Sequence, residues 1–305
     1  MPIHRHLAPR RHRRRYWPVA KILTLNTFLH DIRLFGRIPV YPPAPFVAER
    51  MAALPDALDD IDADVVCLQE VFRRPHRAFI AERMRRRYRH SVGLRHPGLP
   101  LGSGLMILSR HPISSAGPKE YRSALFEERL AIRMGYLGCV TELPDLGPFR
   151  LINTHLVACG LGTDPEGRRG ETCRSLEIGE LLREASPVDG MPTIIAGDFN
   201  CGPHTSAENF GQILAGGFVD LAASSGAGDA MSWDPGNPLV TGKNLALPRQ
   251  RIDHILLHQA DFDRWRPASV RIVLDECRVA TVAGTRVPVS DHYGLLTTIG
   301  PVDAA

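Results

Sequence analysis

The cysteines of this chain form no pattern that would bind zinc or define a disulfide framework. The chain has 305 residues and 6 cysteines, with no Cys-x-x-Cys pair and no zinc-ligand spacing among them. Cys67 and Cys139 lie within apolar runs, where a buried free thiol is the usual state. We therefore expect a reducing, cytoplasmic setting.

Long apolar segments are also missing from the sequence. No run approaches the roughly 20 residues that a transmembrane helix needs. Residues 19–25 follow an arginine-rich start, but Lys21 and Thr24 interrupt the run, which continues directly into the polar Asn26. A secretion signal needs an uninterrupted apolar stretch and a small-residue cleavage site. The sequence therefore predicts neither a transmembrane segment nor a secretion signal.

A large net charge is missing as well, since the formal charge at pH 7 is only +4. The basic excess is concentrated in residues 4–15, which could bind nucleic acid or anionic lipid, or form a solvated tail. The composition, 44% hydrophobic and 23% charged, is ordinary for a globular protein and allows a large core. We expect a disordered tail over residues 1–18 and one domain over residues 19–300, present as a monomer.

Short apolar runs alternate with stretches of helical spacing along the chain. Strands are expected at residues 21–26, 64–70, 104–109, 129–140, 149–154, 193–196, 251–257, 270–274 and 293–299. Helices are expected at residues 46–58, 73–87, 170–184 and 205–214, and the proline-rich segment 37–45 is expected to form a rigid loop. This order predicts an α/β fold (mixed α+β) of two packed mixed sheets flanked by helices.

Polar side chains follow or interrupt several of these predicted strands. Glu70 comes after the apolar run 65–68 and Gln69, where a carboxylate is costly unless it is paired or holds a cation. We favour metal ligation there over a buried salt bridge. Asp198 and Asn200 lie two residues apart, so extended backbone aims both the same way, although an Asx turn is the structural alternative.

Three further positions carry polar groups of the same kind. Asn26 ends the first predicted strand and His155 lies in another, where a turn-forming asparagine and a structural histidine are the alternatives. Asp253 lies inside an otherwise apolar strand, and burying it without a partner would cost several kcal/mol. The obvious partner is the imidazole of His292, in the triplet 290–292, Ser-Asp-His.

Seven short motifs in order resemble the endonuclease/exonuclease/phosphatase superfamily, which includes deoxyribonuclease I, abasic-site endonucleases, inositol-polyphosphate 5-phosphatases and neutral sphingomyelinases. The resemblance covers about residues 20–299. Its motifs are Leu25-Asn26, Leu68-Gln69-Glu70-Val71, Ser103-Gly104-Leu105 through Ser109-Arg110-His111-Pro112-Ile113, Asn153-Thr154-His155, Gly197-Asp198-Phe199-Asn200, Arg251-Ile252-Asp253-His254-Ile255-Leu256 and Ser290-Asp291-His292. It implies a four-layer αββα sandwich, deoxyribonuclease I-like, with the site at one edge of the paired sheets.

The resemblance also implies a role for each site residue. Asn26 and Glu70 look like ligands of a divalent metal, Mg²⁺ or Mn²⁺, and Asp291 would help to hold the metal or the geometry. Asp198 and Asn200 would position the attacking water or the scissile phosphate, and His155 would bond the phosphoryl oxygens. His292 would be the general base, oriented by Asp253. The implied reaction is in-line attack of water on a phosphate ester.

The nearest subgroup by resemblance is the sphingomyelinase-type phospholipases C. Their Trp-Asp…Asn element is similar to Ser232-Trp233-Asp234-Pro235 with Asn237, which assigns Trp233 and Asn237 to substrate binding. Two features depart from the secreted bacterial sphingomyelinases, because residues 276–288 are short and free of aromatics and Leu156 stands where those enzymes have glutamine. The substrate expected first is a phospholipid or a head-group ester, with at most weak peripheral membrane contact.

Two other functions compete with this one. A nuclease, or an abasic-site endonuclease, acting on DNA or RNA is favoured by the arginines of residues 73–87 and by the arginine-rich tail. A solvated helix face is the structural alternative, and the sequence shows no aromatic–basic interleaving of the kind that reads bases. A catalytically silent binding scaffold ranks last, because every expected catalytic position is filled.

Overall fold

Two six-stranded sheets pack face to face at the centre of the molecule. The computed structural model describes residues 19–31, 33, 34, 38, 39, 43–93, 103–123, 132, 134–143, 146–158, 167–188 and 190–302, so the predicted tail lies outside the described residues. The first sheet comprises, in spatial order, β13 (Trp265–Val273), β16 (Gly294–Pro301), β1 (Ala20–Asn26), β4 (Val65–Gln69), β6 (Met106–Ser109) and β5 (His90–Gly93). The second comprises β11 (Phe218–Asp220), β12 (Asp253–His258), β10 (Thr193–Asp198), β9 (Gly147–His155), β8 (Gly135–Leu143) and β7 (Ile113–Glu120).

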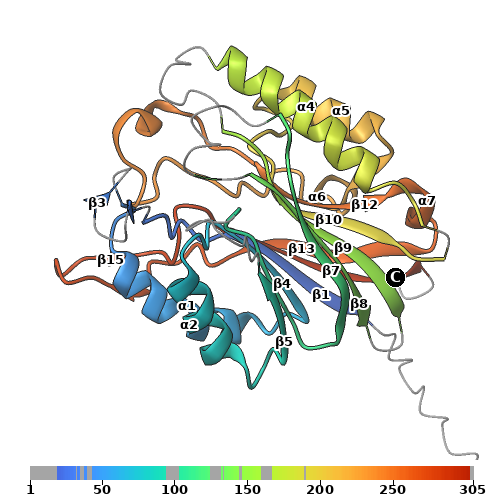
Figure 1. Cartoon of the computed structure of the whole chain (residues 1–305). Helices are drawn as coiled ribbons and strands as arrows, with labels where there is room; N and C mark the ends of the chain where they lie inside the picture. The colour runs from blue at the N-terminus through green and yellow to red at the C-terminus, as the bar shows by residue number, and fades with distance from the viewer. Residues whose placement is uncertain are drawn as a thin grey trace, which may run out of the picture.

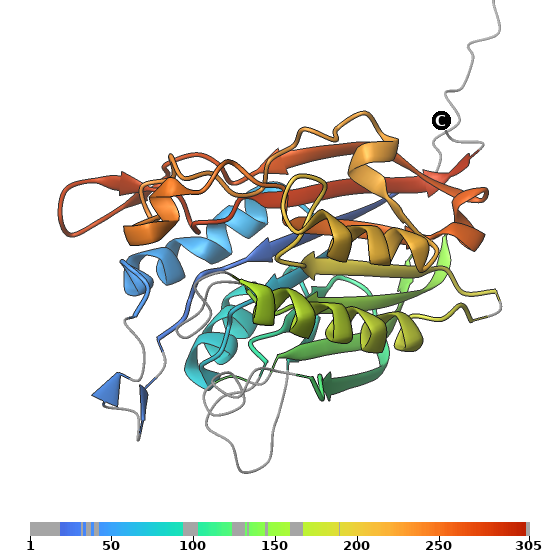
Figure 2. The ribbon, with the colours of Figure 1, turned by 90° about the horizontal axis from the view of Figure 1, so that it is seen from above.

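Helices cover the outer face of each sheet, as Figures 1 and 2 show. The first sheet carries α1 (Val47–Ile61) and α2 (Arg74–Met84), and the second carries α4 (Arg168–Glu184) and α5 (Ala207–Ala215). The predicted four-layer αββα sandwich is confirmed. Smaller elements are the hairpins β2 (Arg33–Leu34) with β3 (Ile38–Pro39) and β14 (Val279–Ala280) with β15 (Arg286–Val287), and the short helices α6 (Leu221–Ser224), η1 (Gly242–Ala246) and α7 (Gln259–Phe262).

Three apolar clusters fill the spaces between these four layers. The cluster between the sheets includes Ile22 and Cys67 from the first sheet and Ile255 from the second. A second cluster joins the first sheet to α1 and α2, and a third joins the second sheet to α4 and α5. Because both faces of the central strands are covered, their sequences read as nearly continuous apolar runs rather than as alternating ones.

The strand register brings the ends of five strands to one edge of the sandwich. β1 and β4 are parallel, with Asn26 opposite Gln69, and β9 and β10 are parallel, with Asp198 opposite His155. β12 is antiparallel to β10 and begins with Asp253 opposite Asp198. The polar residues that end the predicted strands therefore lie at the same edge.

Some elements differ from the sequence expectation. α2 ends at Met84 rather than at residue 87, and β8 begins at Gly135, whereas part of the predicted strand 129–140 lies outside the described residues. β7 was not predicted, because its Ser-Ser-Ala-Gly-Pro run has low strand propensity, but an edge strand tolerates proline. Residues 38 and 39 of the predicted loop form β3, and residues 276–288 contain the β14–β15 hairpin. No helix in the described part of the chain is long and apolar enough to cross a membrane.

Candidate active site

The two sheets contribute opposite sides of a single cluster of polar side chains. Asn26, from the end of β1, donates through Nδ2 to Glu70 Oε1 at 3.2 Å and to Asp198 Oδ2 at 3.0 Å. Its Oδ1 accepts the backbone N–H of Phe28 at 3.0 Å, which is the turn role considered for it. The amide of Asn26 therefore joins the end of β4 in the first sheet to the end of β10 in the second.

Glu70 is held in a strained backbone conformation directly after β4. Its φ of 60° lies in the left-handed region, which a residue other than glycine adopts only when its surroundings impose it. His30 Nδ1 lies 3.4 Å from Glu70 Oε2. Burial alone would raise the pKa of this carboxyl, but the contact with His30 and the donors around it lower the pKa to about 2. Glu70 is therefore ionised at neutral pH.

His292 and Asp253 form the pair that the sequence predicted. His292 Nδ1 lies 2.8 Å from Asp253 Oδ2, and both side chains are buried. Ser232 Oγ accepts the backbone N–H of Asp253 at 3.0 Å and holds this end of β12 in place. Burial would lower the pKa of the His292 imidazole, but Asp253, Asp291 and Asp198 together raise it well above its usual value. The opposite ring nitrogen, Nε2, lies 3.8 Å from Asp198 Oδ2 and faces the centre of the site.

Asp198 links the remaining predicted residues. His155 Nε2 lies 3.3 Å from Asp198 Oδ2, and the backbone N–H of Asn200 donates to Asp198 Oδ1 at 2.9 Å. This second contact is the Asx turn named as the alternative, and the Asn200 side chain donates to Leu156 O at 2.9 Å. Burial would lower the pKa of His155, but the charge of Asp198 raises it. Asp198 thus serves both the turn and the cluster.

The chemistry of the available oxygens suits a divalent cation. Glu70 is an ionised carboxylate, and burial together with the neighbouring charge of Glu70 raises the pKa of Asp291 to about 6. Carboxylate and amide oxygens are the donors that Mg²⁺ and Mn²⁺ prefer, so Asn26, Glu70 and Asp291 fit such an ion. Within the described residues, Asp198, Asp253 and His292 also place one ligand atom each within 4.8 Å of one another. The site therefore contains a candidate metal centre.

A comparison with protein families identifies the family of this chain. The model of the Endonuclease/Exonuclease/phosphatase family matches residues 23–292. The chain belongs to this family. Membership makes the protein a hydrolase of phosphate esters, and the reaction class is that of a metal-dependent phosphodiesterase. A comparison with curated protein sequences gives no match.

Solved structures share the family fold at low sequence identity. Sphingomyelinase C from Streptomyces griseocarneus is 20% identical, with a TM-score of 0.73 over 92% of this chain and 99% of that one. A mutant of beta toxin from Staphylococcus aureus with bound magnesium ions is 16% identical, with a TM-score of 0.70 over 91% of this chain and 98% of that one. TDP2 from D. rerio, complexed with a single-strand DNA product, is 18% identical, with a TM-score of 0.68 over 92% and 99%.

Trp233 and Asn237 lie behind the Ser-Asp-His triplet of this family member. Trp233 pairs through its backbone with His292 and with Gln250, and its side chain is buried. Asn237 donates through Nδ2 to Ser290 O at 2.9 Å and accepts from the backbone N–H of Leu239. Both residues support the segment that carries His292. Their contact with substrate stays a prediction.

Arg50 is part of the site and was missed by the sequence reasoning. It lies in α1, and its guanidinium donates to the carbonyl oxygens of Thr27, Phe28, Pro45 and Val289 at 2.6–3.0 Å. The residue has no exposed surface. Arg50 lies four residues before the buried Leu54, on the apolar face of a predicted helix. An arginine at such a position indicates a buried guanidinium that needs partners, and this pattern is present in the sequence.

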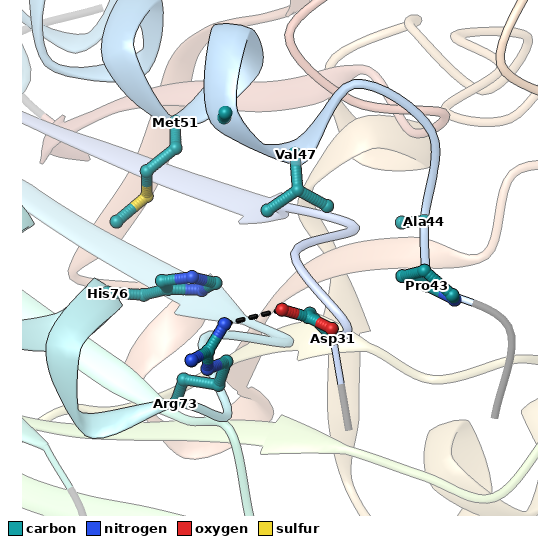
Figure 3. Close-up of a pocket in the computed structure, with 8 residues that line it drawn as sticks. Asp31, Pro43, Ala44, Val47, Met51, Arg73 and His76 are labelled. Atoms are coloured by element: carbon teal, nitrogen blue, oxygen red, sulfur yellow. Dashed lines mark hydrogen bonds and ion pairs between the residues drawn. The ribbon is translucent and has the colours of Figure 1, made fainter. Parts of the chain in front are cut away.

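A pocket of about 290 Å³ lies beside the site, between the beginnings of α1 and α2 (Figure 3). One wall is aliphatic and consists of Pro43, Ala44, Val47, Ala48 and Met51. The opposite wall carries the ion pair between Arg73 and Asp31, together with His76. Asp31 follows His30, whose ring contacts Glu70, so the pocket begins one residue from the cluster.

Proposed function

We propose that this protein hydrolyses a phosphodiester by in-line attack of water, with His292 as the general base. The observation that carries the proposal is the 2.8 Å contact between His292 Nδ1 and Asp253, with Nε2 turned toward Asp198. A carboxylate on one imidazole nitrogen fixes the tautomer and leaves the other nitrogen to take a proton from water once the ring is neutral, a form that the raised pKa of His292 shifts to higher pH. Asp253 would also stabilise the imidazolium that forms.

The other residues would bind and orient the scissile phosphate. His155, whose pKa is raised by Asp198, would donate to a phosphoryl oxygen as negative charge develops there. Asp198 and Asn200 would orient the water and the phosphate. Asn26, Glu70 and Asp291 would hold Mg²⁺ or Mn²⁺, which when bound polarises the phosphoryl group and stabilises its charge.

We propose a phospholipid or a head-group ester as the substrate, as in a sphingomyelinase or phospholipase C. The fold shared with sphingomyelinase C supports this choice, as does the aliphatic wall of the pocket that begins at Asp31, next to His30. Several of the arginines of residues 73–87 form contacts within the chain. Arg77 donates to Val71 O and Phe72 O, and Arg87 pairs with Asp59.

The second candidate is a DNA or RNA phosphodiesterase, for which the observation is the similarity to TDP2 complexed with a DNA product. The two are separated by assaying the purified protein with Mg²⁺ against sphingomyelin, lysophospholipid, bis-p-nitrophenyl phosphate and supercoiled plasmid. We expect EDTA-sensitive turnover of a lipid and of the aryl diester. Plasmid nicking that disappears in His292→Ala, without lipid turnover, would establish the nuclease instead.

The division of roles has its own test. Glu70→Ala should lose activity that excess Mg²⁺ partly restores, because the variant lacks a metal ligand. His292→Ala should lose activity that metal does not restore. The matched control is His90→Ala, since His90 lies on edge strand β5 opposite Ser109, at the far end of the sheet from Glu70. Equal losses in both site variants, insensitive to metal, would contradict this assignment.

A further inference from the structure

The site works only if the two sheets keep one relative position. Asn26 and Glu70 come from the first sheet, whereas Asp198 and Asp253 come from the second. The contacts that unite them cross the gap between the sheets: Asn26 Nδ2 to Asp198 at 3.0 Å, and His292 Nδ1 to Asp253 at 2.8 Å. Hydrogen bonds weaken steeply with misalignment, so a small slide of one sheet over the other would break both contacts.

Most side chains between the sheets cannot fix the relative position of the two sheets. The cluster between them consists of aliphatic, aromatic and thiol side chains such as Ile22, Ile107, Leu151 and Ile255. Burial of such groups is favourable but not directional. Apolar contacts hold the sheets together without specifying their register to a fraction of an ångström.

A pair of buried amides crosses the gap next to the site. Gln69 follows Val65 and Cys67 on the inward face of β4, and Asn153 follows Leu151 on the inward face of β9, at positions where the pattern would continue with apolar residues. Gln69 Nε2 donates to Asn153 Oδ1 at 2.8 Å. Neither residue has any exposed surface.

Further hydrogen bonds tie this pair to both neighbouring strands. Asn153 Nδ2 donates to Leu68 O at 2.9 Å and to Met106 O at 3.1 Å, at the last pair of the β4–β6 ladder. Gln69 Nε2 also donates to Thr24 Oγ1 on β1 at 3.1 Å. One side chain of the second sheet thus binds three groups of the first, and burying these amides is tolerable only because they are bonded to one another.

We propose that Gln69 and Asn153 are positioning residues, which form an inter-sheet amide bridge that sets the register between the two halves of the active site. Gln69 immediately precedes Glu70, and Asn153 comes two residues before His155. The bridge therefore acts on the backbone that carries a metal-ligand candidate and a phosphate-binding candidate. Its kinetic test rests on the proposed function, whereas its spectroscopic test does not.

The chain contains a matched control for this bridge. Ser109 Oγ and Thr141 Oγ1, also buried, lie 3.2 Å apart and join β6 to β8 across the same gap. Ser109 is opposite Val65, whereas the bridge begins at Gln69, so the two contacts are about 13 Å apart at roughly 3.3 Å per strand residue. Thr141→Val removes this hydroxyl contact without changing the shape of the side chain.

The experiment compares Asn153→Leu, Gln69→Leu, the double variant and Thr141→Val. Each single amide variant should melt at a lower temperature than the wild type, because the remaining amide stays buried and loses the hydrogen bond that joined the pair. The double variant should regain part of that melting temperature, since neither polar group remains. Its kcat on bis-p-nitrophenyl phosphate should still be roughly tenfold to a hundredfold below wild type with little change in KM, because the side chains of the active site would be misplaced relative to one another.

A second readout follows the geometry without catalysis. The proton between His292 Nδ1 and Asp253 should give a low-field NMR resonance, which its loss in His292→Ala would assign. We expect it to shift or disappear in Asn153→Leu and in the double variant, and to be unchanged in Thr141→Val. An unchanged resonance in the double variant would overturn the proposal, and so would a kcat loss in Thr141→Val equal to that of the double variant. A wild type inactive on every phosphate ester tested would refute the proposed function, while the resonance would still test the bridge.

Discussion

Replacing Arg50 by methionine should destabilise the protein and disorder one side of its active site. The Arg50 guanidinium binds carbonyl oxygens from the turn after β1 (Thr27 and Phe28), from the segment before α1 (Pro45) and from the residue before the Ser-Asp-His triplet (Val289). A methionine side chain at this position would have no donors. The four carbonyl groups would lose their partner, and the contacts to Thr27 and Val289 are fully buried.

The expected loss in the free energy of unfolding follows from two opposing contributions. Four hydrogen bonds from a charged donor contribute about 1.5–3 kcal/mol each in favourable cases. Burying the guanidinium costs several kcal/mol, and burial lowers the pKa of Arg50 to about 10 despite the nearby Asp291 and Glu70. The net loss on removing the arginine should be about 3–5 kcal/mol, the usual range for breaking a buried charged interaction from one side. For a domain of this size that corresponds to a melting temperature lower by roughly 6–10 °C.

The assay is chemical and thermal unfolding of Arg50→Met, Arg50→Lys and the control Arg83→Met. Arg50→Lys keeps the charge but cannot place donors on all of the carbonyls, so it should fall between the wild type and Arg50→Met. Arg83 Nη2 lies 3.7 Å from Asp56 in an exposed pair, and such pairs contribute at most about 1 kcal/mol. If Arg50→Met unfolded within about 1 kcal/mol of the wild type, the role assigned to Arg50 would be refuted.

Three further changes have defined outcomes. Burial lowers the pKa of His254 to about 4, so the unfolded chain binds more protons between about pH 6.5 and pH 4 and stability falls as the pH is lowered through that window. The loss should approach roughly 3 kcal/mol, and equally steep pH profiles of the unfolding free energy for wild type and His254→Gln would contradict it. Gly197→Ala should lower that free energy by about 1–3 kcal/mol or more, because a Cβ atom at Gly197 would lie 2.0 Å from Thr154 O; an unchanged urea midpoint would be inconsistent with this contact. Asp253→Asn should lower kcat by roughly 10²–10⁴-fold while the fold is retained, because the amide no longer fixes the tautomer of His292. Steady-state kinetics would measure kcat and a denaturation curve would confirm folding; a smaller loss of kcat in the folded variant would contradict this role.

The sequence was sufficient for the fold and for the pairing at its centre. Asp253 interrupts an apolar strand, and because a buried carboxylate requires a partner, the pairing with His292 could be predicted and is present at 2.8 Å. The strand ends at Asn26, Glu70 and Asp198 could be brought together once the sheets were predicted, because the ends of parallel strands share an edge.

Other features depend on tertiary geometry that a local pattern does not contain. The residues around Arg50 and Asn153 do not reveal their partners, which lie on elements remote in sequence, with Val289 239 residues away from Arg50. β7 forms because β8 offers an edge to pair with, not because its own residues favour a strand. The contact of Trp233 and Asn237 with substrate stays a prediction, since both are held within the chain.

The pairing of β1 with β16 has a consequence for how this enzyme is made. β16 lies between β1 and β13 within the first sheet, with Ala20 opposite Ile299. The first described strand therefore gains its antiparallel partner only when the last described strand has formed. His292 enters the site on the same segment. During synthesis, therefore, a ribosome-bound chain can build local helices and hairpins, but it lacks His292, the proposed general base, until the residues beyond it have emerged and β16 has docked. If His292 is the base, as proposed, catalytic activity should appear in one step at the end of folding, and turnover would then report complete assembly.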